Sequence, residues 1–480
     1  MFNIIPQNYR IMLEEILRKE SSNFTSHLCD SIINNIFNSD ANNKYLSLIN
    51  EINENSMLHI KNIMIKMFET LDFSYKKSFA RKQRYYINKS NVPRTIITIF
   101  GEISFKRTYY INKFSNDKYF YLDQLIGLVK YDHYDPIVKA KAIYLTCKTN
   151  QAEGGRITGE SISSLLDVCK NNVLTHIPRQ SVYNWISKWN TPSIKYDAAL
   201  NTPSTLYVMA DEKYIGSQDL DNDIMIKSCV IFEGVKKVGK NRNALINKLV
   251  ISANTKTPWI TFTDIINQRY DMSKIKHIYL MGDGASWIKS GISELKLNPN
   301  IEVKFLLCKF HFIQYIHHIT TDKDLREVLI NMVLNGKKSD LINKFNEIIA
   351  GDPKRKEQLT KKTNYILNNF NSIKAMNNSN IGSSMESHIS HYIASTFASR
   401  PKGYSSLNIK KYLMINDYKN NGINIMDLYL QSYQNTEVIT LNQKEIDYSI
   451  FDKKGSNIPI INYGKNTNTY KLLSRISSVL

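Results

Sequence analysis

The sequence lacks several features that would point to a secreted or membrane protein. It has five cysteines, which are scattered and form no Cys-x-x-Cys pair. This pattern argues against a disulfide framework and for a reducing compartment. No apolar run approaches the length needed to span a membrane, and residues 1–20 lack the basic start and apolar core of a signal peptide. We therefore expect a soluble cytoplasmic protein with no membrane partner.

Other signatures are also missing. No segment repeats, and Gly239-Lys240 lacks the glycine frame of a phosphate-binding loop. The cysteines and histidines show no finger spacing, and a structural zinc site needs four ligands at defined intervals. The sequence therefore gives no basis for a nucleotide-phosphate loop, a solenoid or a zinc finger.

Positive charge is in clear excess. The 480 residues carry 63 Lys and Arg against 43 Asp and Glu, which gives a net charge of +20 and a pI near 9.4. Such an excess favours an anionic partner, nucleic acid first. An A/T-rich genome is the alternative explanation, because it would enrich Asn, Ile, Lys and Tyr together. The clustering of the cations favours nucleic acid.

The densest cluster of cations lies in residues 76–94, which contain no acid. Phe79, Tyr85 and Tyr86 alternate with the charges, so the segment combines phosphate-neutralising groups with rings that stack on sugars or bases. A solvated linker is the alternative. The cations are Lys76, Lys77, Arg81, Lys82, Arg84, Lys89 and Arg94.

A second candidate DNA-binding element is a helix pair at residues 159–168 and 179–189. The second helix should bury Val182, Trp185, Ile186 and Trp189 and expose Ser181, Asn184 and Lys188 on its opposite face. A short polar and basic face of this kind can enter the major groove, as in a helix-turn-helix. An ordinary helical hairpin is the alternative.

The chain changes character after Pro203, where strand-like runs begin. A helix near 262–269 separates the first three from the last two, and residues 234–240 look like a turn rich in glycine and lysine. Three strands, a helix, a strand, a helix and a strand form the α/β layout of a ribonuclease-H-like fold. The predicted strands are 206–210, 224–232, 248–252, 277–281 and 303–308.

Three carboxylates in this region are candidates for metal-dependent chemistry. Asp211 is expected at the end of the first strand, and Asp283, in Gly282-Asp283-Gly284, follows the fourth. Adjacent carboxylates repel each other unless a cation such as Mg²⁺ or Mn²⁺ lies between them. Glu386 is the best third ligand. Its alternative role is a capping box with Ser383 at the start of a helix over 384–398.

The motifs resemble those of the ISLre-type insertion-sequence transposases, relatives of the Mutator-like branch of the Asp-Asp-Glu superfamily. Each motif is short, but their order across residues 95–420 is specific. The motifs are Phe100-Gly101-Glu-Ile-x-Phe-x-Arg107-x-Tyr109, Val208-Met-Ala-Asp211-Glu-Lys-Tyr, Gly282-Asp283-Gly-Ala-Ser-Trp287-Ile, Cys308-Lys-Phe-His311-Phe, Glu386-Ser-His-Ile-Ser-His391 and Ser399-Arg400-Pro401-x-Gly403.

The resemblance implies a function and a set of site residues. Asp211, Asp283 and Glu386 would be the catalytic triad and would hold two Mg²⁺ (or Mn²⁺) ions. Cys308 and His311 would support the active site, although Asp often stands in place of Cys308 in such relatives. Arg400 would contact DNA. The protein would cut double-stranded DNA at the terminal repeats of an element. It would then join the freed 3′-hydroxyl to target DNA, as a homodimer or higher oligomer in a bacterial nucleoid.

These observations predict a ribonuclease-H-like core interrupted by an all-α insertion. Mainly helical DNA-binding regions with a small β-hairpin module would precede this core. Two other functions stay open: a non-catalytic DNA-binding protein derived from a transposase, and a nuclease without strand transfer. The expected segments are a helical region 1–94, a β module 95–130, a helical region 131–200, core 201–319, insertion 320–380, final core helix 381–420 and tail 421–480.

Overall fold

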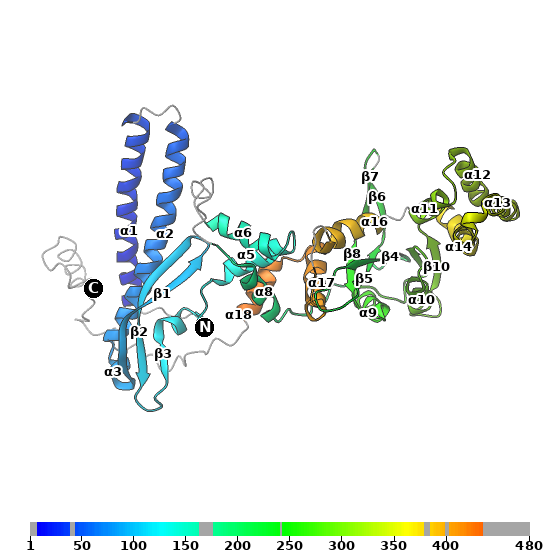
Figure 1. The fold of residues 1–480 in the computed structure, drawn as a ribbon. Helices are drawn as coiled ribbons and strands as arrows, with labels where there is room; N and C mark the ends of the chain where they lie inside the picture. Colours follow the sequence, from blue (N-terminus) through cyan, green and yellow to red (C-terminus); the bar gives the residue numbers. More distant parts are fainter. Residues whose placement is uncertain are drawn as a thin grey trace. The chain divides into compact units, whose positions relative to one another are not determined.

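A computed structural model describes residues 7–38, 44–162, 176–240, 242–378, 385–398 and 403–434 (Figure 1). The chain divides into two compact units. The first is built from residues up to 146, from 151–186 and from 429 onward, and the second from 147–150 and 187–428. Because residues 421–428 belong to the second unit, the segment first taken as a tail contains part of a folded unit.

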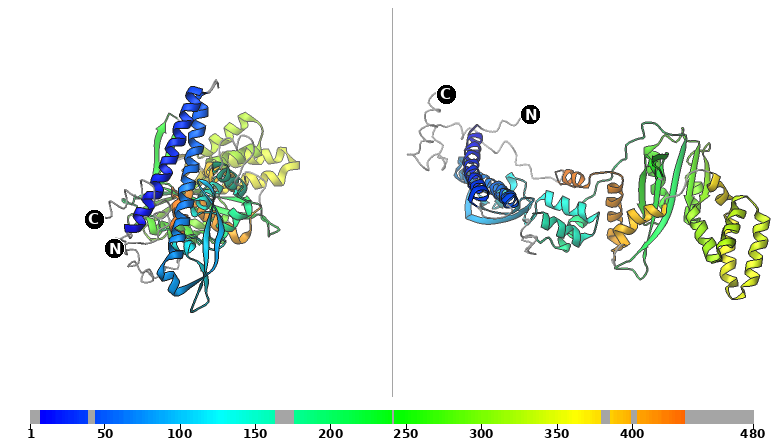
Figure 2. Two further views of the ribbon diagram at one scale, coloured as in Figure 1. Left: turned by 90° about the vertical axis from the view of Figure 1, so that its left-hand side faces the viewer. Right: turned by 90° about the horizontal axis from the view of Figure 1, so that it is seen from above.

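The first unit begins with a long helical hairpin. Helices α1 (Gln7–Ile33) and α2 (Lys44–Lys77) lie side by side in every view (Figures 1 and 2), and a short π-helix, η1 (Asn34–Asn38), extends α1. The carboxyl-terminal half of α2 carries an apolar face that packs on a small sheet. Residues in this contact are Met64, Ile65, Phe68 and Leu71 from α2 and Ile96, Ile103 and Phe105 from the sheet.

The small sheet comprises β1 (Tyr85–Thr98), β2 (Gly101–Asn112) and β3 (Lys118–Phe120), all antiparallel in that order. Gly101, with φ 105°, makes the turn between β1 and β2. Strand β1 begins at Tyr85, so the expected boundary between residues 94 and 95 was wrong and falls inside a strand. Pairing with β2 extends β1 through a polar stretch that has little strand preference of its own.

Two arginines of this module are buried structural groups. Arg94 is only 7% exposed and donates from Nη2 to the carbonyl oxygens of Val129, at 3.1 Å, and of Asp132. Arg107 pairs with Asp123, and its guanidinium lies 3.6 Å from the ring centroid of Phe120. Arg94 therefore does not belong to the exposed basic segment in which the sequence seemed to place it.

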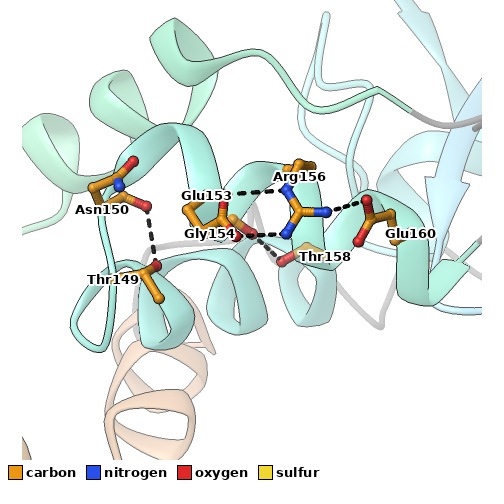
Figure 3. A network of polar contacts seen from close by, with 7 residues as sticks. All are labelled: Thr149, Asn150, Glu153, Gly154, Arg156, Thr158 and Glu160. Carbon is orange, nitrogen blue, oxygen red and sulfur yellow. Dashed lines mark hydrogen bonds and ion pairs between the residues drawn. The ribbon is translucent and has the colours of Figure 1, made fainter.

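Helices α4 (Tyr121–Leu125), α5 (Pro136–Thr146), α6 (Gln151–Ile162) and α8 (Arg179–Lys188) follow. On α6, Arg156 lies between Glu153 and Glu160 and pairs with both (Figure 3). This arrangement neutralises a cation that would otherwise be available to a ligand. Within the same helix, the Thr158 hydroxyl donates to the Gly154 carbonyl at 2.6 Å.

The second unit is built on a mixed five-stranded sheet in the order β10-β9-β4-β5-β8. Strand β4 pairs antiparallel with β5, and β5 with β8, whereas β4, β9 and β10 are parallel. The strand predicted at 224–232 is confirmed as β5. The bounds are β4 (Thr205–Ile215), β5 (Ile224–Phe232), β8 (Leu249–Ala253), β9 (His277–Gly282) and β10 (Glu302–Leu307).

Helices α9 (Pro258–Arg269) and α10 (Ser286–Glu294) contribute to the main core of this unit on one face of the sheet. Leu206, Val208 and Ala210 of β4 belong to this core. Because successive side chains of a strand point to opposite faces, Met209 and Asp211 point to the other face.

Residues 234–240, expected to form a turn, are mostly a strand. Strand β6 (Gly234–Gly239) pairs with β7 (Arg242–Ile246), and the two form a separate ribbon (Figure 1). In the sequence, this ribbon comes between β5 and β8. The glycines and lysines that resembled a turn lie in a hairpin stabilised by cross-strand pairing.

A helical module follows β10. It contains α11 (Lys309–Ile319), α12 (Lys323–Leu334), α13 (Lys338–Gly351), the short η2 (Pro353–Arg355), α14 (Lys356–Asn368) and α15 (Phe370–Asn378). Phe312 and Ile316 of α11 share an apolar core with Leu329, Phe345 and Ile366. The module therefore begins at Lys309, and the expected start at residue 320 was too late.

The last described elements return to the sheet. Helix α16 (Met385–His388) continues as a π-helix, η3 (Ile389–Ala398), and both contact β4. Helix α17 (Ser406–Asn420) packs on β8, where Asp417 and Asn421 accept from the amides of Ser252 and Val250 at 2.6 and 2.7 Å. These bonds satisfy the open edge of the sheet. Helix α18 (Ile425–Gln434) follows, and none of the helices in the described part of the chain is long and apolar enough to cross a bilayer.

Candidate metal centre and active site

The two candidate aspartates lie on neighbouring parallel strands. Asp211 was expected at a strand end, but β4 continues to Ile215, and Asp211 pairs with Ser228 inside it. The parallel pairing of β4 with β9 stops at Met209. Asp211 therefore lies just beyond the last residue that β9 covers, and Asp283 follows the end of β9. The edge of β4 is open at this point.

Glycine is required on both sides of Asp283. A Cβ atom at Gly282 would lie 2.9 Å from the carbonyl oxygen of Ala210 and 2.9 Å from the side chain of Ile288. Gly284 has φ 89°, a conformation that other residues adopt only with strain. Between these glycines, Asp283 Oδ1 accepts from the amide of Ala285 at 2.8 Å, which fixes the start of the turn.

Three side chains from distant parts of the sequence converge on the open edge. One ligand atom each from Asp211, His311 and Glu386 lies within 4.8 Å of the other two. Asp211 comes from β4, His311 from the first turn of α11, and Glu386 from the first turn of α16. Asp211 is buried, His311 is half-buried and Glu386 is exposed, so the cluster opens to solvent on one side.

The electrostatics of Asp211 reflect its burial and its charged neighbours. The pKa of Asp211 is raised to about 6, mainly by burial, and the charges of Asp283 and Glu386 contribute in the same direction. The amide of Glu212, which donates to Asp211 Oδ1 at 2.8 Å, and the charge of His311 act in the opposite direction. Such repulsion is relieved by a cation. Asp283 is close enough to contribute charge, although it lies outside the three-residue cluster.

His311 has a distinct environment. The side chain of Cys308 is the largest cause that raises the pKa of His311, and Asp211 and Asp283 add to this effect. Cys308 is buried and precedes the first residue of α11, so its backbone begins the helix that carries His311. The arrangement gives the Cys308-x-x-His311 motif a place at the carboxylates, and it makes His311 a possible fourth ligand.

Sequence reasoning missed two groups that hold the aspartate segments. The hydroxyl of Tyr365, on α14, donates to the carbonyl oxygen of Asp283. Trp287 Nε1 donates to Glu212 Oε2, and the carbonyl of Trp287 accepts from Trp259 Nε1 at 2.6 Å. The position of Trp287, four residues after Asp283 in a quoted motif, was the one available signal. Nothing in the sequence singled out Tyr365.

The predicted DNA-binding residues of the basic segment lie in the first unit and have mixed exposure. Lys77, Lys82 and Arg84 are exposed, whereas Lys76 and Arg81 are half-buried. Arg81 donates from Nε and Nη2 to the carbonyl of Lys76 at 3.0 and 2.6 Å, so it caps the end of α2.

Helix α8 exposes two of the three predicted polar residues, and Trp185, expected to be buried, is half-buried. Asn184 and Lys188 are exposed and Ser181 is half-buried, whereas Val182 and Ile186 are buried. The second half of the predicted partner helix, at 163–168, lies outside the described residues, as do Arg400 and the candidate capping residue Ser383. Helix α8 therefore has the face that groove binding needs, while the helix-turn-helix interpretation stays a prediction.

Comparison with known proteins assigns the chain to a family. The model of the uncharacterised protein family UPF0236 matches residues 44–432, so the chain belongs to this family. The match includes both units and all the candidate site residues.

Full-length relatives occur in Caldanaerobacter subterraneus subsp. tengcongensis. One UPF0236 protein of this bacterium is 25% identical over 480 residues and covers 96% of this chain and 97% of its own. Another, 24% identical with the same coverage, carries eleven designations in its name. A UPF0236 protein of Streptococcus gallolyticus is 25% identical over 295 residues, which is 60% of this chain and 63% of its own.

Proposed function

We propose that this protein is a DNA transposase that cleaves and joins the ends of a mobile element. The observation that carries the proposal is the convergence of Asp211, His311 and Glu386 beside Asp283 at the open edge of β4. Residues 211 and 386 are separated by an entire helical module. Their meeting at one point, with Asp211 buried, is the kind of arrangement expected of a functional site.

The sheet supports a ribonuclease-H-like core. An antiparallel β4-β5-β8 meander is followed by α9, the parallel strand β9, α10 and the parallel strand β10. Helices α11–α15 then come between this sheet and the helix that carries Glu386, as an insertion in the core would. Ligands in open α/β sheets gather at the carboxyl ends of parallel strands, where Asp283 and Cys308 lie.

The relatives add support of a different kind. In a single bacterium, the name of one UPF0236 protein combines eleven designations, and the name of a second combines four. A protein present in many copies in one genome is what a mobile element that carries its own transposase would leave.

The donor set fits a divalent cation. Asp211, Glu386 and the adjacent Asp283 provide carboxylate oxygens, which Mg²⁺ and Mn²⁺ prefer, and His311 adds an imidazole nitrogen that Mn²⁺ accepts well. Such a cation, when bound, supplies Lewis-acid stabilisation of a phosphodiester undergoing displacement.

Residues of the chain itself fix the positions of the two aspartates. Burial on β4 fixes the carboxyl group of Asp211. Tyr365 holds the backbone of Asp283, and Gly282 allows β4 and β9 to approach closely at this edge. The geometry is therefore set by buried residues before any ligand arrives.

The test is strand cleavage and strand transfer on duplex DNA that carries the inverted repeats flanking the coding region. With Mg²⁺ or Mn²⁺, we expect nicks at the repeat ends and joined products. Asp283→Asn should lower both by about a thousandfold, because the change removes a carboxylate that would hold the cation at the reacting phosphate. Asp264→Asn, an exposed acid on α9, is the matched control and should retain activity.

Near wild-type cleavage by Asp283→Asn would contradict the proposal. Cleavage without joined products would instead identify a nuclease that lacks strand transfer.

A further inference from the structure

The ribbon formed by β6 and β7 has no assigned role in the proposed reaction. Its two strands pair only with each other and lie outside the five-stranded sheet (Figure 1). A two-stranded ribbon is marginally stable in water unless something holds it. Its base is held where Asn247 donates to Glu233 at 2.8 Å and the amide of Glu233 donates to Ile246 at 3.0 Å.

The outer part of the ribbon is strongly basic. Residues 234–247 contain four cations and no acid. Lys236, Lys237 and Lys240 are exposed, and among the described residues none of these three lysines forms an ion pair or a side-chain hydrogen bond. Arg156 on α6, in contrast, pairs with two acids. The ribbon lysines therefore keep their charge available for an external anion.

The geometry of the ribbon narrows the choice of anion. Lys236 lies opposite Ala244 and Lys237 opposite Asn243, so consecutive lysines point to opposite faces. A membrane or a flat acidic protein surface would engage one face only. The two phosphate backbones that border a groove of double-stranded DNA would engage both. The major groove, about 12 Å wide, accepts a two-stranded ribbon.

The ribbon also presents an apolar side chain near its tip. The strand register shifts between Lys237 and Gly239, which is a β-bulge at Val238. A bulge redirects a side chain out of the regular pleat, and Val238 is 51% exposed. An apolar residue between cations can contact base edges or sugars within a groove while the lysines contact phosphates.

We propose that the β6–β7 ribbon inserts into a groove of double-stranded DNA and binds the phosphates on both sides. The choice of DNA as the anion rests on the proposed function, while the ribbon geometry is independent of it. Lys237 lies nine residues beyond Ser228, the partner of Asp211. At about 3.3 Å per residue the ribbon reaches at most about 30 Å from the site, or roughly nine base pairs of DNA.

Binding is measured with the full-length protein, in EDTA so that no cleavage occurs, on a fluorescent mixed-sequence duplex of about 40 base pairs. The variant is Lys236→Ala/Lys237→Ala/Lys240→Ala. The matched control, Lys256→Ala/Lys276→Ala/Lys296→Ala, removes three exposed lysines elsewhere in the same unit. The ribbon variant should bind about tenfold more weakly at about 0.1 M salt, and its slope of log Kd against log salt should fall by about 2 to 3.

A triple Lys→Arg ribbon variant keeps the charge and should bind as the wild type does, which separates phosphate contact from misfolding. Equal losses in the ribbon and control variants would overturn the proposal, because the effect would then be that of net charge. A loss confined to RNA or single-stranded probes would also overturn it. Since the assay needs no catalysis, its failure would leave the outcome for Asp283→Asn untouched.

Discussion

The hydroxyl of Tyr365 donates a hydrogen bond to the backbone carbonyl of Asp283, 82 residues earlier in the chain. Tyr365 lies on α14 in the helical module, and its ring stacks on Tyr315 of α11 with centroids 3.8 Å apart. The helical module therefore holds the aspartate turn in place, and it is more than an insertion that the sheet tolerates.

Removing this hydroxyl should impair the reaction more than DNA binding. We expect Tyr365→Phe to lower the rate of strand cleavage about tenfold, the cost of one hydrogen bond, with unchanged DNA affinity. Tyr315→Phe is the matched control, because Tyr315 provides the stacked ring and its hydroxyl has no hydrogen bond among the described residues. Single-turnover cleavage rates measure the difference. Equal rates in the two variants would show that the bond does not position Asp283.

His311 should contribute to metal binding as a nitrogen donor. We expect His311→Ala to weaken Mn²⁺ binding by about tenfold and Mg²⁺ binding by less, because imidazole suits Mn²⁺ better than Mg²⁺. Isothermal titration with each ion measures this without reference to activity. His317→Ala, an exposed histidine on the same helix, is the control. An identical loss for the two ions would indicate that His311 acts only through packing.

Asp417 should make the protein less stable as pH rises. Burial raises the pKa of Asp417 from 3.8 to about 7, despite two hydrogen bonds from Ser252. Because the folded state holds this proton more tightly than the unfolded chain, the stabilisation is complete below pH ~4 and is lost as pH rises through about 7.

Asp417→Asn removes this dependence. Its free energy of unfolding relative to wild type should increase between pH 5 and pH 8, with a ceiling of roughly 4 kcal/mol for the full shift. Urea unfolding of both proteins across this range measures the difference. Asp427→Asn, in the first turn of α18, is a control that should show no such trend. If the difference in unfolding free energy between the two proteins does not change with pH, Asp417 is charged across the whole range.

Substitution of the buried Arg94 and of the exposed lysines in the basic segment should have different effects. Arg94→Ala leaves the buried carbonyls of Val129 and Asp132 without their donor, so it should reduce stability by about 1–3 kcal/mol. Lys77→Ala/Lys82→Ala changes exposed groups and should weaken DNA binding with an unchanged melting temperature. Thermal melts and fluorescence anisotropy together distinguish the two classes. Weakened DNA binding by a folded Arg94→Ala protein would contradict this division.

The elements predicted best from the sequence are strands whose own residues favour β structure. The run 224–232 could hardly be anything but a buried strand, and β5 has those bounds. The run 303–308 likewise gave β10, which ends one residue earlier, at Leu307. Runs rich in β-branched and aromatic or other large apolar residues carry this information locally.

The elements that were misplaced depend on pairing with a neighbouring strand, which the residues of the element itself do not reveal. Strand β1 starts at Tyr85 because β2 pairs with it, and β6 is a strand because β7 pairs with it. The acids of the candidate site could be listed from motifs, but their grouping could not be derived. Nothing local shows that His311 rather than Asp283 lies within 4.8 Å of Asp211 and Glu386. That grouping follows from the contact of α16 with β4 and from the position of α11 directly after β10.

The order of the ligands along the chain has a consequence for synthesis. Glu386, the last member of the cluster, enters the site only after β4, β9, β10 and α11–α15 have been made. A product that stops before Met385 would keep the β6–β7 ribbon and the helical hairpin but would lack this carboxylate. Under the proposed function, incomplete copies of such a gene would encode fragments that keep the proposed DNA-binding ribbon but lack one of the proposed catalytic carboxylates.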